Sequence, residues 1–395
     1  MLLPAETARY QKHLNLPEIG TEGQLKLKQA RVLVVGAGGL GCPVLLYLAA
    51  AGVGTLGIID PDTVDISNLQ RQVLYTTEQV GQPKAVMAAN HLRKLNPEIR
   101  LKIYAHALDR SNARTLIDEY DLVIDCTDNF AVRYLVNDAC VLLGKPFIYG
   151  AIHRFEGQVA VLNAPLSADA LTVGIAPNSV TPDAESQNAV RRGPTYRCLF
   201  PEHPNQMEIP NCADTGVLGV LPGVIGTYQA NEAIKLITGI GHPLSDSLLM
   251  VDLLAMSFQK IKVRRRADAD AAARRGWEEG IKVGAAAAAQ RKITPKELAD
   301  RLSQGEEIFL LDVRERPEYN ICHLEGAVLI PVNIIANNIK RIPADRPVVV
   351  YCHHGIRSQY VVDYLQTEHG FTNLKNLQGG IHAWAREVEP EMEVY

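Results

Sequence analysis

The chain of 395 residues has no excess of positive charge: 40 lysines and arginines stand against 44 acidic residues, for a formal net charge of −4. A protein that binds nucleic acid through bulk charge has the opposite balance, so we expect no direct nucleic-acid partner. Cysteine is also scarce. The seven cysteines form an odd count, which argues against a secreted disulfide scaffold and favours a reducing, cytoplasmic location.

Segments typical of exported or membrane proteins are lacking too. The first twenty residues have no apolar signal-peptide core and carry charged side chains, namely Glu6, Arg9, Lys12 and Glu18. One stretch without charge, residues 32–59, is long enough to span a bilayer. Glycines and a proline interrupt it, however, and a strand, a glycine turn, a helix and a second strand explain it better. We therefore expect no membrane span.

Length and composition predict a globular chain with two or three domains, at about 150 residues per domain. Apolar residues make up 47% and charged residues 21%, which is enough for sizeable cores. We place a first domain at residues 1–263, an Ala- and Arg-rich solvated linker at 264–292, and a second, small α/β domain at 293–395.

The apolar runs of the first domain alternate with helical stretches, which predicts parallel βαβ units and a doubly wound, mostly parallel α/β sheet. The expected strands are 31–35, 55–59, 101–104 and 122–124, and the expected helices are 40–51, 84–95 and 216–237. In the second domain we expect strands at 308–311, 328–330 and 348–351, and a capped helix start at Thr294. We interpret residues 165–215 as a long, mobile loop, and loops of this length are usually functional or disordered.

A glycine-rich turn follows the first expected strand and opens a helix, in the sequence Gly36-Ala-Gly-Gly-Leu-Gly41. Its glycines, Gly36, Gly38, Gly39 and Gly41, let the backbone approach a phosphate, and the helix N-terminus stabilises negative charge. Asp60 ends the second strand, where a carboxylate can accept ribose hydroxyls. This pattern alone predicts a nucleotide site and equally suits an NAD-dependent oxidoreductase.

Cationic and acidic residues beyond this turn favour ATP over NAD. Arg71 and Lys84 can neutralise a triphosphate, and Asp128 can hold Mg²⁺, which prefers one or two carboxylates plus phosphate oxygens. A hydride-transfer site does not need this combination. The residues lie in three short motifs: Ser67-Asn-Leu-Gln-Arg-Gln72, Gly81-Gln-Pro-Lys84 and Asp125-Cys-Thr-Asp-Asn129.

These motifs, in this order, resemble the MoeB/ThiF family of adenylating enzymes, relatives of the ubiquitin-activating enzymes, over about residues 5–263. The resemblance implies a homodimer in which ATP activates the C-terminal glycine of a ubiquitin-fold sulfur-carrier protein ending in Gly-Gly. It also implies contacts with ATP or magnesium for a set of residues: Gly39, Asp60, Ser67, Asn68, Leu69, Gln70, Arg71, Lys84, Asp128 and Asn129.

The chain departs from that family pattern at two places. Lys12 stands where members commonly have an arginine that reaches ATP, often across a dimer interface; it keeps the charge but loses the bidentate fork, and we still expect it to contact phosphate. Many members also bind zinc through two Cys-x-x-Cys pairs. Here Thr195 replaces the first cysteine of the pair with Cys198, and residues 264–275 contain no cysteine, so we predict no structural zinc.

Two cysteines are candidate nucleophiles. Cys212 precedes the expected helix 216–237, where a thiolate can be stabilised, and it matches a position at which two-domain family members carry a cysteine that links to the carrier. Cys352 follows the strand 348–351 in a short loop whose N–H groups are expected to point inward, and Arg357 adds positive charge. Both features favour a thiolate or persulfide at Cys352. We interpret the remaining candidates Cys42, Cys126 and Cys140 as core residues.

The segment from Cys352 to Arg357 spans only six residues, which suits one extra sulfur atom better than the phosphate of a tyrosine phosphatase. Together with Leu311-Asp-Val-Arg314 and Gly379-Gly-Ile-His-Ala-Trp384, it resembles a rhodanese domain over residues 293–395. We expect Asp312 and Arg314 to organise this domain by hydrogen bonds and Cys322 to be structural.

The fusion of both domains resembles MoeB–rhodanese enzymes that charge sulfur carriers. The hypothesis is that Cys352 accepts sulfur from a cysteine desulfurase or another persulfide donor and passes it to the adenylated carrier, giving a thiocarboxylate. Three alternatives stay open: an activator that conjugates ubiquitin-like proteins to other proteins, an NAD-dependent oxidoreductase, and a non-catalytic scaffold. Among end pathways the resemblance favours molybdopterin or tRNA thiolation over thiamine or cysteine synthesis.

Overall fold

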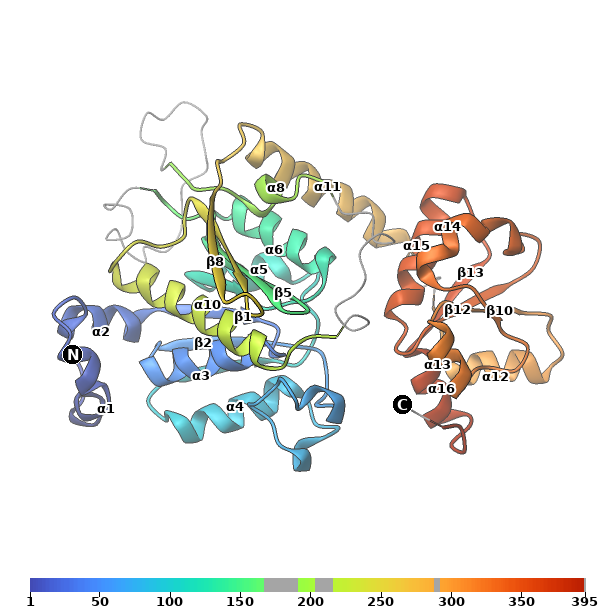
Figure 1. Ribbon diagram of the computed structural model, residues 1–395, viewed down its shortest axis with the longest axis horizontal. Helices are drawn as coiled ribbons and strands as arrows, with labels where there is room; N and C mark the ends of the chain where they lie inside the picture. Colours follow the sequence, from blue (N-terminus) through green and yellow to red (C-terminus); the bar gives the residue numbers. More distant parts are fainter. Residues whose placement is uncertain (167–190, 203–215, 288–291, 394–395) are drawn as a thin grey trace. The chain divides into compact units, whose positions relative to one another are not determined.

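The computed structural model describes residues 1–166, 191–202, 216–287 and 292–393. The chain divides into two compact units, the first within residues 1–280 and the second within residues 281–395. Each unit has its own β-sheet covered by helices (Figure 1).

The sheet of the first unit has eight strands in the order β3-β2-β1-β4-β5-β6-β7-β8. The strands from β3 to β5 are parallel, and β6, β7 and β8 continue the sheet antiparallel. This arrangement confirms the doubly wound, mostly parallel fold. The strands are β1 (Arg31–Val35), β2 (Thr55–Ile59), β3 (Arg100–Tyr104), β4 (Leu122–Asp125), β5 (Phe147–His153), β6 (Glu156–Leu162), β7 (Ser247–Asp252) and β8 (Ser257–Lys262).

Helices cover both faces of this sheet, so the central strand β1 is buried on both sides. Val32 and Val34 pack into one apolar core, and Leu33 and Val35 pack into the other, which explains the uninterrupted apolar run of β1. The helices are α1 (Pro4–Leu14), α2 (Gly20–Gln29), α3 (Gly41–Ala51), α4 (Lys84–Leu95), α5 (Ala113–Asp118), α6 (Phe130–Leu142), α8 (Tyr196–Leu199), α10 (Val220–Thr238) and α11 (Ala269–Ala287), with 3-10 turns η1 (Ile66–Asn68) and η2 (Thr77–Gln79).

The uncharged stretch 32–59 forms β1, the glycine turn, α3 and β2, as its pattern predicts. In the parts of the chain that the structure describes, no helix is long and apolar enough to cross a membrane.

Helix α11 departs from the solvated linker that we expected in this part of the chain. Ala269, Ala273 and Trp277 recur every four residues and are buried on one face of the helix. Trp277 joins the core beneath α5 and α6, and the Arg110 guanidinium lies 5.6 Å from its ring centre. Arg110 also donates hydrogen bonds to the carbonyl oxygens of Gly276 and Trp277. This part of α11 therefore extends the first unit.

The second unit is a five-stranded, all-parallel sheet in the order β11-β10-β12-β13-β9. Thr294 caps α12 as expected, since its hydroxyl accepts a hydrogen bond from the Glu297 N–H at 3.2 Å. The strands are β9 (Lys292–Ile293), β10 (Phe309–Asp312), β11 (Val328–Leu329), β12 (Val348–Tyr351) and β13 (Leu374–Leu377). The helices are α12 (Pro295–Ser303), α13 (Arg316–Ile321), α14 (Ile335–Asn338), α15 (Ile356–His369) and α16 (Gly380–Glu387), with 3-10 turns η3 (Val332–Ile334) and η4 (Ile339–Arg341).

Candidate active sites

The glycine turn lies at the carboxyl end of β1, where the strand order reverses between β2 and β4 and where ligands of open α/β sheets bind. Gly36 has a φ of +93°, and a Cβ there would lie 2.9 Å from the Cys126 carbonyl oxygen. A Cβ on Gly41 would overlap with the Gly36 carbonyl oxygen. A Cβ on Gly38 would meet only Gln72 Nε2, at 3.5 Å. The turn therefore requires Gly36 and Gly41, whereas Gly38 leaves open space for a ligand.

Asp60, at the end of β2, holds the glycine turn in place. Its carboxylate accepts hydrogen bonds from the N–H groups of Ala37 at 2.7 Å and Asp62 at 2.8 Å. Burial raises the pKa of Asp60, and the nearby Lys84 charge opposes that shift. Each carboxylate oxygen has a further lone pair, so a ligand hydroxyl can still be accepted.

Lys84 begins α4 beside this carboxylate. Its Nζ lies 3.1 Å from Asp62 Oδ2, and its side chain is 6% exposed while that of Asp62 is 66% exposed. The ion pair therefore keeps the Lys84 ammonium group near the glycine turn, while the Asp62 carboxylate remains in contact with solvent.

Residues 67–71 form a compact turn next to the glycine turn. The carboxylate of Asp65 accepts hydrogen bonds from the Ser67 N–H at 2.8 Å and its hydroxyl at 2.6 Å. Arg71 donates to the Ser67 carbonyl oxygen at 3.2 Å, and its Cδ would lie 3.7 Å from a Cβ on Gly39. Leu69 packs against the core, and Gln70 lies where a Cβ on Gly219 would overlap with it.

Gln72 ends the motif Ser67–Gln72, but the sequence alone did not indicate a role for it in the site. It is 4% exposed, and its Nε2 donates to Asn68 Oδ1 at 3.0 Å beside Gly38. Its Oε1 is buried and has no hydrogen-bond partner among the described residues. A buried acceptor without a donor costs free energy, so this atom is suited to a donor from a ligand.

Asp128 and Asn129 follow β4, the strand next to β1. The preceding Asp125 is buried and accepts hydrogen bonds from the Thr127 N–H at 3.0 Å and hydroxyl at 2.7 Å, which orders the turn. Asn129 caps α6 by accepting a hydrogen bond from Val132 N–H at 3.3 Å. Asp128 is exposed at this edge of the sheet, and its carboxylate oxygens are of the kind that can hold Mg²⁺.

Within its own chain, Lys12 does not lie near the glycine turn or Lys84. It lies exposed on α1, which is anchored by Tyr10. The Tyr10 hydroxyl accepts a hydrogen bond from Asn96 at 2.8 Å, and its ring lies against Gly52. Gly52 and Asn96 follow the C-terminal ends of α3 and α4, whereas the glycine turn and Lys84 lie at the N-terminal ends of these helices.

Cys352 follows β12 in a loop that holds its sulfur atom from two sides. The thiol is 1% exposed and lies 3.1 Å from the Gly355 nitrogen and 3.4 Å from Ser358 Oγ. Ser358 donates to Asn376 Oδ1 at 2.6 Å, and Asn376 Nδ2 donates to the Gly355 carbonyl oxygen at 2.9 Å. One loop N–H, that of Gly355, thus points at the sulfur.

The start of α16 clamps this loop through the double glycine. The N–H groups of Ile381 and His382 donate to the carbonyl oxygens of Cys352 and His353 at 2.9 and 3.0 Å. A Cβ on Gly380 would overlap with both carbonyl oxygens, so only glycine permits this approach. Gly379 and Gly380 belong to the rhodanese-like motif 379–384, but the sequence alone did not indicate this positioning role.

Arg357 has a partner that the sequence did not reveal. Its two terminal nitrogens donate to the Glu318 carboxylate at 2.8 and 2.6 Å, and this carboxylate offsets the charge that we expected near Cys352. Asp312 and Arg314 form a fully buried ion pair, with Arg314 Nη2 2.6 Å from Asp312 Oδ2. The same nitrogen donates to the Cys322 carbonyl oxygen at 2.7 Å, which matches the expected framework role.

Family comparison decides the class of these two units. The ThiF family model matches residues 10–272, more than half of the chain, and the rhodanese-like domain model matches residues 294–387. The chain belongs to the ThiF family and carries a C-terminal rhodanese-like domain.

Two of three similar relatives match this ThiF–rhodanese chain over nearly its full length, and the third matches two thirds of it. The probable adenylyltransferase/sulfurtransferase MoeZ of Mycobacterium tuberculosis is 44% identical over 399 residues, covering 99% of this chain and 95% of the relative. The adenylyltransferase and sulfurtransferase MOCS3 of Culex quinquefasciatus is 38% identical over 418 residues, covering 99% and 90%. A sulfur carrier protein adenylyltransferase of Thermus thermophilus is 50% identical over 260 residues, covering 66% and 88%.

The ThiF–rhodanese chain is accordingly an enzyme of the adenylyltransferase and sulfurtransferase class, not the NAD-dependent oxidoreductase that the glycine motif alone allowed. Among solved structures, that of E. coli MccB with ATP is similar at a TM-score of 0.53 and 23% identity, covering 67% of this chain and 73% of that chain. This likeness shows the fold of the first unit alone.

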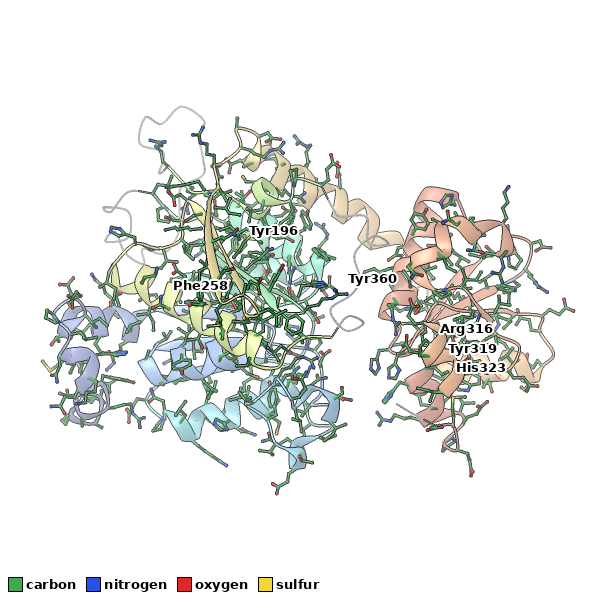
Figure 2. The ribbon with its side chains drawn as sticks, in the orientation of Figure 1. Tyr196, Phe258, Arg316, Tyr319, His323 and Tyr360 are labelled. Atoms are coloured by element: carbon green, nitrogen blue, oxygen red, sulfur yellow. The ribbon has the colours of Figure 1, made fainter. Side chains whose placement is uncertain are left out.

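Two expectations concern cysteines of the ThiF unit. The Cys198 sulfur accepts hydrogen bonds from the N–H groups of Thr195 at 3.3 Å and Arg266 at 3.4 Å. The absence of a structural zinc site, which needs more ligands than one thiol, stays a prediction. Tyr196, which begins α8 and is labelled in Figure 2, is fully buried in the core of the first unit. Cys212 lies outside the described residues, whereas Cys42, Cys126 and Cys140 are buried as expected.

Proposed function

We propose that the first unit adenylates the C-terminal glycine of a ubiquitin-fold sulfur carrier ending in Gly-Gly, and that Cys352 of the second unit supplies the sulfur. One observation carries this proposal. The same chain combines a glycine turn of the kind that binds nucleotides, held by Asp60 at the carboxyl end of β1, with a buried cysteine, Cys352, in a tight loop. The names of the MoeZ, MOCS3 and sulfur carrier protein adenylyltransferase relatives support it.

In the first step the carrier carboxylate attacks the α-phosphate of ATP, and pyrophosphate leaves. The open side of Gly38 admits the phosphates, and Arg71 and Lys84 neutralise their charge. Asp128 and Asn129 offer oxygen ligands for Mg²⁺, which when bound offsets phosphate charge. Catalysis here rests on positioning and charge, since no protein group forms a covalent bond.

In the second step the terminal sulfur of a Cys352 persulfide attacks the activated carbonyl carbon, and AMP leaves. The product is an acyl disulfide between the carrier and Cys352. A thiol, which we assign to Cys212, attacks the Cys352 sulfur and displaces the carrier thiocarboxylate, which leaves a disulfide between Cys212 and Cys352. An external dithiol reductant then returns both cysteines to thiols and is itself oxidised to a disulfide. The Gly355 N–H and the Ser358 hydroxyl stabilise the sulfur atom of Cys352. A cysteine desulfurase or another persulfide donor supplies the sulfur.

The deciding experiment is ATP–pyrophosphate exchange by the full chain, with and without candidate carriers. We expect exchange that requires one carrier and disappears when its last glycine is deleted. Cys352→Ala should leave this exchange intact and abolish thiocarboxylate formation, because Cys352 acts only after adenylation. Unchanged thiocarboxylate formation in Cys352→Ala, with a protein persulfide as donor, would refute the sulfur relay; absence of exchange with every carrier would refute carboxylate adenylation.

A further inference from the structure

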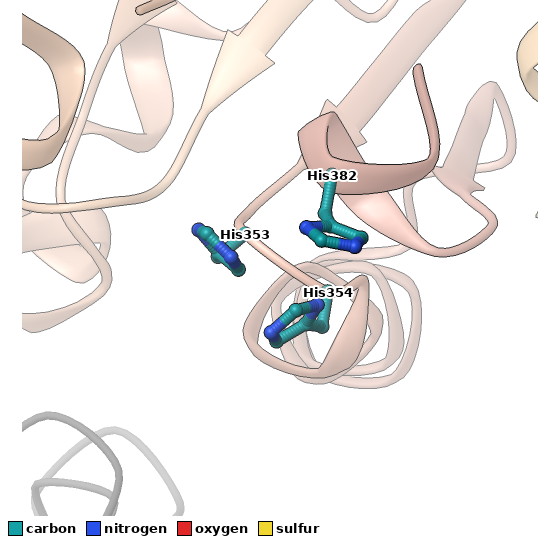
Figure 3. Close-up of side chains that lie close together, drawn as sticks. All are labelled: His353, His354 and His382. Carbon is teal, nitrogen blue, oxygen red and sulfur yellow. The ribbon is translucent and has the colours of Figure 1, made fainter. Parts of the chain in front are cut away.

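Three histidines gather beside the Cys352 loop. His353 and His354 belong to the loop itself, and His382 belongs to α16; their rings surround a common space (Figure 3). The ring centres of His353 and His354 lie 4.1 Å apart, and that of His382 lies 5.6 Å from the first and 5.0 Å from the second. One ring nitrogen from each residue lies within 4.8 Å of the other two.

The backbone fixes this arrangement. His382 N–H donates to the His353 carbonyl oxygen at 3.0 Å, and Gly380 lets α16 approach closely enough for that bond. The proposed sulfur chemistry uses other groups, since the sulfur of Cys352 contacts Gly355 and Ser358. The three imidazoles therefore form a cluster that the proposed function does not require.

An imidazole binds a transition metal through the lone pair of a ring nitrogen. The buried Nδ1 of His382 has no hydrogen-bond partner among the described residues. A metal ion would satisfy a nitrogen atom of this kind.

We propose that His353, His354 and His382 form a binding site for a divalent transition-metal ion, represented here by Zn²⁺. Three imidazoles with a fourth open position are a common tetrahedral zinc set. With Zn–N bonds of about 2.0–2.1 Å, tetrahedral geometry places the nitrogen atoms roughly 3.3 Å apart. Closing from 4.8 Å needs a side-chain rotation, and His354 is the exposed member of the three. This site is separate from Cys198 and the zinc cysteines of the ThiF family.

A bound ion has a structural consequence, because metal–nitrogen bonds tie the loop after Cys352 to α16. Ligands that bind only the folded state raise its stability by mass action. Zn²⁺ should therefore raise the melting temperature of the second unit within the full chain, in addition to binding there.

The test is Zn²⁺ titration of the full chain by calorimetry after chelator treatment. His382→Ala removes one of three ligands and should weaken this binding by at least about tenfold, since even residues that only orient ligands contribute that much. His369→Ala is the matched control: it lies in the same unit, and its Nε2 is 2.9 Å from the Tyr364 hydroxyl. We expect wild-type binding from this variant.

Cys352→Ala separates the histidine site from the nearby thiol. We expect Zn²⁺ binding to persist in this variant. The wild-type protein loaded with Co²⁺ should show no thiolate-to-metal charge-transfer band, because the Cys352 sulfur is not a ligand of the ion. The proposal is wrong if the Cys352→Ala variant no longer binds Zn²⁺ while the His382→Ala variant still does. His354→Ala, at an exposed position, gives the same test should His382→Ala fail to fold. Wild-type affinity in either folded histidine variant would also overturn the site.

Discussion

At the scale of single residues, the glycines of the nucleotide turn serve two different purposes. A side chain on Gly41 would overlap with the Gly36 carbonyl oxygen, whereas one on Gly38 would make only an ordinary contact with Gln72. The same residue type is thus required by the fold at one position and available to the ligand at the other. A sequence motif cannot separate these roles, because they depend on where the folded turn places the Gly36 carbonyl oxygen and the Gln72 side chain.

Gly38→Ala should therefore keep the fold and lose adenylation. A methyl group in the open space beside Gly38 blocks the approach of phosphate, and we expect carrier-dependent pyrophosphate exchange to fall at least about tenfold, or ~1.4 kcal/mol. Thermal melting by circular dichroism should match the wild type, while Gly41→Ala should fail to fold. Wild-type exchange in a folded Gly38→Ala protein would place the phosphates elsewhere.

Ser358→Ala tests the hydrogen bonds behind Cys352. It removes a hydroxyl 3.4 Å from the sulfur and leaves the buried Asn376 Oδ1 without its 2.6 Å donor. An unsatisfied buried acceptor costs about 1–3 kcal/mol, so chemical denaturation should show a second unit destabilised by that amount. Sulfur acceptance by Cys352 should slow, and pyrophosphate exchange should not change. Ser303→Ala, at an exposed site of the same unit, is the control; equal stability of the two variants would contradict this role.

The site residues that the sequence left unassigned depend on neighbours that lie far along the chain. Gln72 lies beside Gly38, Glu318 binds Arg357, and Gly380 lies against the Cys352 loop, so no local pattern marks these contacts. By contrast, Asp60 and Asp128 could be placed from the sequence, because the ends of adjacent parallel strands meet at one edge of a sheet.

At the scale of elements, buried parallel strands were the most predictable. The bounds of β1, β2 and β12 coincide with the expected runs 31–35, 55–59 and 348–351, because burial on both faces produces continuous apolar segments. Helix α11 was not predicted as part of a core. Its buried face consists of alanines and one tryptophan, so its hydrophobic pattern is weak, and its packing depends on the surface formed by α5 and α6.

Trp277→Ala measures how firmly α11 is bound to the first unit. Trp277 is 7% exposed in the core, so truncation should lower the free energy of unfolding by about 3 kcal/mol. The neighbouring exposed Glu278→Ala should change it by less than about 0.5 kcal/mol. Far-ultraviolet circular dichroism in urea compares both variants without relying on tryptophan fluorescence. Equal stabilities would mean that this part of α11 behaves as the solvated linker suggested by its composition.

At the scale of the whole molecule, the position of α1 bears on assembly. Lys12 cannot serve the glycine turn of its own chain, because Tyr10 anchors α1 at the opposite ends of α3 and α4. If Lys12 contacts phosphate, as the family resemblance implies, it must do so from a second copy. A homodimer with two-fold symmetry would give each site the Lys12 of the other chain.

Dimers with differently tagged chains test this arrangement. A dimer of one Lys12→Ala chain and one Asp128→Ala chain retains one complete site if Lys12 acts across the interface, so it should show about half of the wild-type exchange. A dimer of one wild-type chain and one chain carrying both substitutions should then be inactive, since the intact Asp128 faces the altered residue 12. The reverse pattern would mean that Lys12 acts within its own chain. The matched pair contains the same substitutions, so only their distribution between chains accounts for a difference.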